Sequence, residues 1–378
     1  MGDILHALPA VTALRQAHPE WIIDWVVEPR WRALLSAPDG GDGSPAKRTS
    51  GAEAPLLSAA NVRAEALTYP PGMAATRGPS RPIVDRIHLA ATKDWRQRLL
   101  SAATIRAIRE LRGALKAGGY DAVVDMQGAV RSAVIARLAG SQRLIGEEEP
   151  RERAVRRLYT ERVATIGAHV IEQDVELASA VAGDALTPVR PWLPVDAAAE
   201  AWCDSLLAAR EAAPVALINP GAGWGAKRWP AERYAAVAAG LIRRGFRVLV
   251  NAGPGEEALA GVIAQHTGGA AAPLVCTLDQ LIALTRQVAL VVAGDTGPLH
   301  LACALGRPVV GIYGPTDPSR NGPFGTEFKV LRSPGSRRDH KRRTSPEAGL
   351  LTIIPKEVLG AADELVRGHA PVREKTER

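Results

Sequence analysis

A chain of 378 residues favours two domains, and its apolar content of 46% supports a sizeable core without any run long enough, at roughly 18–20 residues, to span a membrane. The net charge of +7 favours an anionic partner, whereas an aromatic content of 4% argues against the stacking platforms that bind single-stranded nucleic acid. Three scattered cysteines indicate a reducing compartment and argue against a disulfide framework or a zinc site, and no secretory signal is visible at the amino end.

The first half alternates predicted helices and strands, as a parallel α/β domain does. It opens on a helix over 10–17 with a strand over 21–27 behind it, so the pattern lacks the first strand of a βαβ unit. Residues 38–82, rich in Gly, Pro, Ala and Ser and without periodicity, are interpreted as a disordered insertion. The later predicted elements are strands over 83–90, 120–125 and 143–146, and helices over 101–117, up to 138, and over 169–181.

The second half alternates more cleanly, after three prolines within 186–194 that mark a linker. Its predicted strands are 215–219, 247–251, 274–276, 288–292 and 308–313, and its predicted helices are 231–244, 256–266, 278–286, 299–305 and 356–366. The predicted organisation is an N-terminal domain over 1–185, a linker over 186–195, a C-terminal domain over 196–354, a C-terminal helix over 355–368 and a tail over 369–378.

The stretch Ala293-Gly-Asp-Thr-Gly-Pro-Leu-His300 joins a predicted buried strand to a predicted helix. In an open parallel sheet, strand carboxyl ends and helix N-termini converge at such turns, where ligands bind. A helix N-terminus offers unpaired N–H groups and partial positive charge, which suit a diphosphate. The Thr296 hydroxyl can cap the helix or donate to a ligand, and Gly297 lets a phosphate approach the backbone. The alternative is an ordinary capped turn.

Two further loops follow strands of the second half. In Asn219-Pro-Gly-Ala-Gly-Trp-Gly-Ala-Lys-Arg-Trp-Pro230, the glycines permit close approach and Lys227 supplies a cation for phosphate. Its spacing matches neither a Walker loop nor a G-x-G-x-x-G turn, and a flexible βα loop is the alternative. In Asn251-Ala-Gly-Pro-Gly-Glu-Glu257, a carboxylate can accept hydrogen bonds from ribose hydroxyls or merely favour the helix N-terminus. At the amino end, Asp3 fits a simple N-cap aspartate.

Three ordered motifs together resemble glycosyltransferase family 9, which holds the ADP-heptose:lipopolysaccharide heptosyltransferases. They are Met1-Gly-Asp-Ile-Leu-His-Ala-Leu-Pro-Ala10, the loop 219–230 and the turn 293–302. The resemblance covers nearly the whole chain apart from 38–82 and the tail. It is strongest to heptosyltransferase I, through stretches such as Thr92-Lys-Asp-Trp-Arg-Gln97 and Tyr120-Asp-Ala-Val-Val-Asp-Met-Gln-Gly128. In the loop 219–230, Ala222 and Gly223 depart from the hydroxyl residues that heptosyltransferase I often has there.

The resemblance implies a GT-B fold of two Rossmann-like domains facing each other across a cleft, here with the first strand of the N-terminal domain missing. It implies inverting transfer of heptose from ADP-heptose, with no cofactor and no obligatory metal. Asp3 would be the general base that deprotonates the acceptor hydroxyl. The donor-binding residues would be Lys227, Glu256, Asp295, Thr296, Gly297 and His300. Among them, Asp295 is expected to order its loop through N–H bonds, and Glu256 to contact the ribose.

The family's acceptor is the Kdo-bearing lipid A core of lipopolysaccharide, which is anionic. Lys93, Arg96, Arg151 and His169 match positions that the family uses for this acceptor, and arginine pairs well with carboxylates. A solvated charged face is the alternative. Because the acceptor is embedded in the inner membrane, the resemblance implies a cytoplasmic protein that is peripheral on the cytoplasmic face of that membrane, with no nucleic-acid partner.

Three alternatives remain. Within the family, the chain fits heptosyltransferase II or another family-9 enzyme. A nicotinamide oxidoreductase would need a G-x-G-x-x-G turn after a strand, with an acidic residue roughly 20 positions on, and no such turn is evident. An inactive binding or scaffold protein is the alternative that the missing strand favours.

Overall fold

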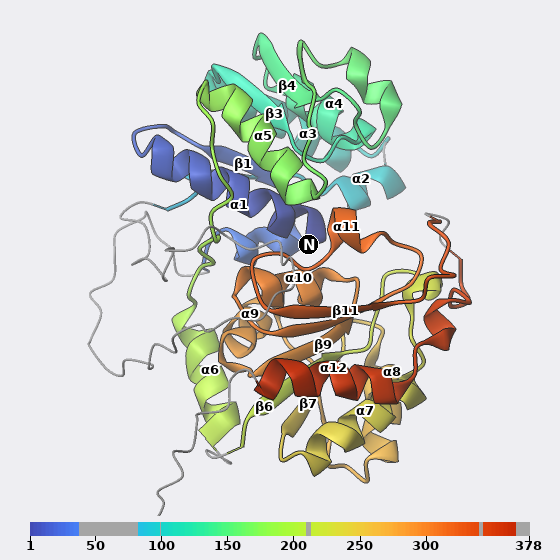
Figure 1. Ribbon diagram of the computed structural model, residues 1–378. Coiled ribbons are helices and arrows are strands. Elements are labelled where there is room, and N and C mark those ends of the chain that lie inside the picture. The colour runs from blue at the N-terminus through green and yellow to red at the C-terminus, as the bar shows by residue number, and fades with distance from the viewer. Residues whose placement is uncertain (38–81, 99, 209–212, 340–342, 368–378) are drawn as a thin grey trace, which may run out of the picture. The chain divides into compact units, whose positions relative to one another are not determined.

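The computed structural model describes residues 1–37, 82–98, 100–208, 213–339 and 343–367 (Figure 1). These residues divide into two compact units, the first ending at Asp196 and the second beginning at Ala197. The insertion predicted over 38–82 lies outside the described residues except for residue 82, and so does the tail over 369–378. Within the described ranges, no helix has both the length and the apolar character needed to cross a membrane.

Unit 1 is built on short parallel strands. They are β1 (Asp24–Val27), β2 (Arg86–Leu89), β3 (Ala122–Asp125), β4 (Arg143–Glu147) and β5 (Glu161–Val163). In the described part of the unit, β1 pairs with β2 in one sheet, and β3, β4 and β5 pair in that order in another. The pairs are all parallel, which agrees with the predicted parallel α/β organisation of the first half.

The helices of unit 1 cover these strands. They are α1 (Gly2–Ala17), α2 (Thr92–Gln97), α3 (Ala102–Gly118), α4 (Val130–Leu138) and α5 (Val170–Ala182), with the 3-10 turns η1 (Pro29–Leu34) and η2 (Arg153–Arg157). Helix α1 packs against α5 through Ala10, Leu14, Val175 and Ala178. It begins at Gly2, eight residues before the prediction, because burial of residues from Leu5 onward outweighs the cost of Pro9 inside the helix.

Unit 2 contains a six-stranded parallel sheet in the order β11-β10-β9-β6-β7-β8. Its strands are β6 (Val215–Asn219), β7 (Arg247–Asn251), β8 (Ala272–Leu274), β9 (Leu290–Gly294), β10 (Val309–Tyr313) and β11 (Phe328–Arg332). Its helices are α6 (Ala197–Ala208), α7 (Ala231–Arg243), α8 (Glu257–His266), α9 (Leu278–Gln287), α10 (Gly297–Ala304), α11 (Pro318–Asn321) and α12 (Pro355–Arg367), with the 3-10 turns η3 (Gly225–Lys227) and η4 (Leu350–Thr352).

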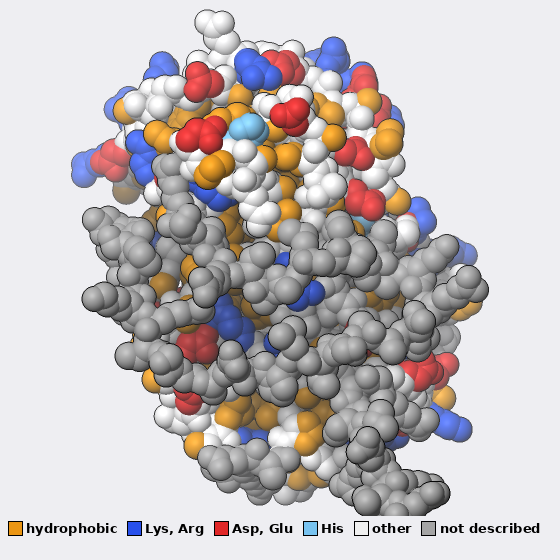
Figure 2. All heavy atoms as spheres, turned by 60° about the vertical axis from the view of Figure 1, so that its left-hand side comes forward, with side chains coloured by type: hydrophobic (Ala, Val, Ile, Leu, Met, Phe, Trp, Pro, Cys, Tyr) orange, Lys and Arg blue, Asp and Glu red, His pale blue; other side chains and the backbone are white. Residues whose placement is uncertain are grey.

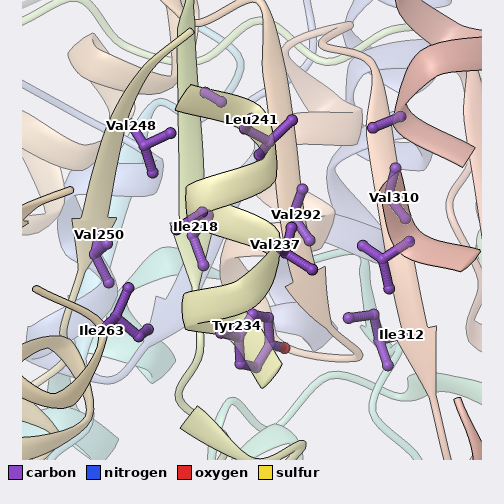
Figure 3. Close-up of a cluster of buried hydrophobic side chains, with 14 of the residues drawn as sticks. Ile218, Tyr234, Val237, Leu241, Val248, Val250, Ile263, Val292, Val310 and Ile312 are labelled. Atoms are coloured by element: carbon purple, nitrogen blue, oxygen red, sulfur yellow. The ribbon is translucent and has the colours of Figure 1, made fainter. Parts of the chain in front are cut away.

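The main core of unit 2 lies between the sheet and helix α7. Figure 3 shows Val237 and Leu241 of α7 among side chains of the strands, including Ile218 and Val292. Helix α12 lies alongside α7 and β11 and adds apolar side chains to the same core (Figure 1). Central strands β6, β9 and β10 are buried along their whole length, as expected for a parallel sheet covered on both faces.

This strand order determines where the site can form. Strand β9 lies between β10 and β6, and all three run in the same direction. Their carboxyl ends therefore bring together the turn after β9, the loop after β6 and the loop after β10. These are two of the predicted ligand-binding segments and one additional loop, 314–317.

Candidate active site

A buried cluster of three charged or titratable side chains forms at the turn after β9. The Lys227 ammonium donates to Asp295 Oδ2 at 2.5 Å and lies 3.3 Å from the Asp295 carbonyl oxygen. His300 Nε2 lies 3.1 Å from the other carboxylate oxygen, Oδ1. Lys227 also sits over the ring of Trp224, 4.7 Å from its centroid. The fold thus brings together three of the residues predicted to bind the donor.

The Asp295 carboxylate is ionised despite its burial. Burial alone would raise its pKa, but the hydrogen bond with His300 and the charge of Lys227 outweigh this effect and hold the pKa well below its usual range. Its hydrogen-bond donors are these two side chains, whereas we predicted that N–H bonds of its own loop would be the main partners. Asp295 therefore organises the site by fixing the cation and the histidine.

Thr296 and Gly297 lie where helix α10 begins. Thr296 is the N-cap residue, but its hydroxyl donates to the Gly294 carbonyl at 3.2 Å and makes no capping bond to the helix. Gly297 and Pro298 open α10. Pro298 has no N–H, and the N–H groups of Leu299 and His300 donate to the Thr296 carbonyl at 3.1 and 3.4 Å. The Gly297 N–H at the start of α10 and the adjacent Lys227 ammonium are donors that suit a diphosphate.

A second segment of unit 2 holds the Lys227 loop in place. The Ala226 N–H donates to the Arg343 carbonyl, and the Ala226 carbonyl accepts from the Glu347 N–H, both at 3.1 Å. A Cβ atom on Gly225 would collide with the Thr344 carbonyl, so this position needs glycine. We call residues 343–349 the clasp. It fixes η3, and with it the origin of the Lys227 side chain.

Glu256 lies beside the glycines of two loops. It caps helix α8 after strand β7, and a Cβ atom on Gly221 would collide with its carboxylate. The Glu256 carboxylate therefore lies against the loop after β6, at the same edge of the sheet as Asp295. Its neighbour Glu257 is exposed and accepts the Gly255 N–H at 3.1 Å. Of the two, Glu256 is the one that the fold brings to the site.

Three polar groups at this edge were not predicted as site residues. Asn251 donates to Asn219 at 2.8 Å, and the Nδ2 group of Asn219 is buried with no hydrogen-bond partner among the described residues. The Tyr234 hydroxyl is fully buried and hydrogen-bonded to the Gly294 backbone, and burial raises its pKa. The sequence does indicate the two asparagines, because β6 and β7 both end in asparagine. Nothing in the sequence distinguishes Tyr234 from the apolar residues of α7 that pack in the core.

In unit 1, the predicted base Asp3 lies in the first turn of α1. It is not the N-cap residue, which is Met1. Its side chain is 55% exposed, and its Oδ2 atom accepts a hydrogen bond from Gln127 Nε2 at 2.6 Å. Arg151 Nη1 lies 4.0 Å from the same oxygen. The segments that follow β3 and β4 thus contact an accessible carboxylate at the start of α1.

The other predicted acceptor residues of unit 1 differ in their exposure. Lys93 and Arg96 are exposed on α2, and the Lys93 N–H donates to Glu28 Oε1 at 3.2 Å. His169 is completely buried: its Nδ1 atom accepts from the Ile171 N–H at 3.2 Å and caps α5. A side chain without accessible surface cannot contact an acceptor. The prediction that His169 binds the acceptor is therefore wrong, and His169 caps α5 instead.

No group of three or more His, Cys, Asp or Glu residues within the described ranges has the arrangement of a metal site. The Lys227 ammonium and the start of α10 are the positive groups that the fold places together at the Asp295 turn.

Comparison with known proteins defines the class of this chain. Among solved structures, "E. coli heptosyltransferase WaaC with ADP" matches with a TM-score of 0.67 at 25% identity, covering 98% of this chain and 97% of that one. "E. coli ADP-heptose lps heptosyltransferase II" matches with a TM-score of 0.69 at 21% identity and the same coverages, 98% and 97%. The chain is a glycosyltransferase with the GT-B fold.

Sequence similarity gives the family. The profile of Glycosyltransferase family 9 (heptosyltransferase) matches residues 108–350, and the chain belongs to this family. Lipopolysaccharide heptosyltransferase 1 of Escherichia coli (strain K12) is 28% identical over 339 residues, which cover 88% of this chain and 91% of that protein. Lipopolysaccharide heptosyltransferase 2 of the same strain is 31% identical over 163 residues, which cover 40% of this chain and 47% of that protein.

Proposed function

We propose that this enzyme transfers heptose from ADP-heptose to the Kdo region of lipid A in lipopolysaccharide inner-core synthesis, with inversion at the anomeric carbon. The observation that carries the proposal is the cluster of Lys227, Asp295 and His300 at the start of α10, which suits the diphosphate of an ADP-sugar. Similarity to heptosyltransferase 1 extends over nearly the whole chain, and this favours that acceptor over the acceptor of type II.

The proposed reaction is one displacement. The acceptor hydroxyl gives its proton to the Asp3 carboxylate as its oxygen forms a bond to the anomeric carbon. The bond between that carbon and the diphosphate oxygen breaks, and its electron pair leaves with ADP. Lys227 and the Gly297 N–H would stabilise the added negative charge on the diphosphate, and Glu256 would accept hydrogen bonds from the ribose hydroxyls. This scheme needs no metal ion.

The acceptor side is proposed to use the basic groups of unit 1. Arg151, beside Asp3, and the exposed Lys93 and Arg96 would pair with the carboxylates and phosphates of the Kdo-lipid A acceptor. The same basic side would hold the enzyme on the cytoplasmic face of the inner membrane as a peripheral protein.

The direct test is an assay of ADP release and of product mass with ADP-heptose and two acceptors. Kdo-lipid A should gain one heptose, whereas an acceptor that already carries the first heptose should react at least tenfold more slowly. Preference for the heptosylated acceptor would assign the chain to type II. Tight binding of ADP without transfer to either acceptor would indicate an inactive binding protein. Retention of activity in excess EDTA would support the metal-free scheme.

A further inference from the structure

The two oxygens of the Asp3 carboxylate have different surroundings. Oδ2 accepts the short hydrogen bond from Gln127 and has Arg151 as its nearest cation. Oδ1 has no hydrogen-bond or ion-pair partner among the described residues, and the Asp3 side chain is 55% exposed. One oxygen is thus held by unit 1 itself, and the other is available to a ligand.

The orientation of Gln127 is fixed at its backbone. Its N–H and that of Gly128 both donate to Asp125 Oδ1, at 3.0 and 3.2 Å. Asp125 is buried at the end of β3, and its Oδ2 atom accepts the Tyr159 hydroxyl at 2.8 Å in the interior. The turn that carries Gln127 is therefore anchored to the core of unit 1.

A hydrogen bond with Arg131 also fixes the orientation of the Gln127 side-chain amide. Arg131 Nη2 lies 3.3 Å from Gln127 Oε1 and can only donate a hydrogen bond. This assigns the oxygen of the amide to the Arg131 side and its NH₂ group to Asp3, because the opposite orientation would set two donors together and two acceptors together. The bond to Asp3 is therefore an N–H donated to a carboxylate oxygen.

A neutral donor suits a general base. An N–H bond to Oδ2 holds the carboxylate in one rotamer and leaves Oδ1 accessible. We propose that Gln127 is the positioning residue for Asp3 and that Oδ1 is the oxygen that takes the acceptor proton. This inference rests on the proposed function, in which Asp3 is the base.

The test compares Gln127→Glu and Gln127→Ala with Gln142→Glu, an exposed glutamine of unit 1 that lies before the start of β4. Gln127→Glu sets a second carboxylate beside Asp3, so the two must share a proton, and the acid limb of the pH profile of kcat should move up by at least about one unit. Gln127→Ala should lower kcat by about 10–100-fold with less than a threefold change in either KM, because Asp3 loses its fixed rotamer. Gln142→Glu should match the wild type in all of these quantities.

The outcomes separate this inference from the function on which it rests. A wild-type enzyme that transfers heptose, with a Gln127→Glu acid limb that coincides with that of the wild type, would overturn the positioning role and leave the transferase assignment intact. A wild-type chain that transfers no heptose would reject the proposed function and the inference with it. Thermal unfolding of each variant within about 2 °C of the wild type would establish that a kinetic change does not come from loss of the fold.

Discussion

At the scale of single residues, the most consequential side chain is the buried carboxylate of Asp295. It pairs with the Lys227 ammonium and forms a hydrogen bond with His300 near the sheet edge. Removing one partner of a buried ion pair costs about 3–5 kcal/mol, because the other charge remains in the interior. The site and the stability of unit 2 therefore depend on the same residue.

Replacing Asp295 with Asn should lower the free energy of unfolding by about 3 kcal/mol at pH 7. The folded state depresses the pKa of Asp295, so its contribution is present above the unfolded value of about 3.9 and is lost as the pH falls through the lower folded value. The difference between wild type and variant should therefore stay constant from about pH 7 to pH 5 and shrink below about pH 4. Urea unfolding across this range measures it, with the exposed Glu232→Gln as control. A difference that grows on acidification would contradict the assignment.

Replacing Asp3 with Asn tests the base directly. The side chain is half exposed, so folding and ADP affinity should be unchanged, while kcat should fall by about 10²–10⁴-fold, the usual contribution of general base catalysis. Calorimetric titration with ADP and steady-state kinetics separate the two effects. A variant with wild-type kcat would remove Asp3 from the mechanism.

The site residues differ in how well the sequence could predict them. Lys227, Asp295 and His300 follow from their loops, because the carboxyl ends of neighbouring parallel strands must meet. His169 was mispredicted, because a motif match does not show whether a side chain points to a ligand or back to its own helix. The sequence analysis included Gln127 only as part of the motif Tyr120–Gly128 and predicted no role for it. Its role comes from a contact with a residue 124 positions away, which no local pattern contains.

At the scale of elements, two neighbouring strands of the unit 2 sheet were predicted with their observed bounds. They are β6 and β7. Each contains an apolar run that ends at an asparagine, and the run of β7 is preceded by Arg247. The edge strand β11 is only partly buried, and the alanine-rich helix α6 has few large apolar side chains, so neither has the periodicity on which the prediction relied. Helix α10 starts at Gly297 instead of 299, because Pro298 is tolerated in a first turn.

The clasp gives an element-scale prediction. Gly225→Ala should force the loop after β6 away from the Thr344 carbonyl and shift the Lys227 side chain. It should weaken ADP binding by about 5–150-fold, since overpacking costs about 1–3 kcal/mol. Gly223→Ala is the matched control in the same loop, because a Cβ atom there meets nothing within 4 Å. Calorimetry with ADP measures both variants. Equal ADP affinities for the two variants would show that the clasp does not fix the position of the loop after β6.

At the scale of the whole molecule, the excess of basic residues is unevenly distributed. Figure 2 shows acidic and basic side chains intermixed over the upper part of its view, and that part has no patch of one sign. The segment of α2 and α3 differs, because its exposed basic residues outnumber the exposed Asp94 and Glu110. These basic residues include Lys93, Arg96, Arg98, Arg106 and Arg109. Beside them Leu100 is 93% exposed, and an apolar side chain flanked by basic ones is the usual composition of a surface that meets anionic lipid.

This surface predicts salt-dependent binding to anionic vesicles. The wild type should sediment with vesicles that contain about one-third anionic lipid and not with neutral ones, and rising salt should release it. The double substitution Arg96→Glu with Arg98→Glu should weaken binding at least about tenfold, because each basic residue near an anionic surface contributes about 1 kcal/mol. Arg243→Glu with Lys356→Glu makes the same change of charge on exposed positions of unit 2 and should bind as the wild type does. Equal losses for the two pairs would mean that net charge alone, and not the α2–α3 surface, governs contact with the membrane.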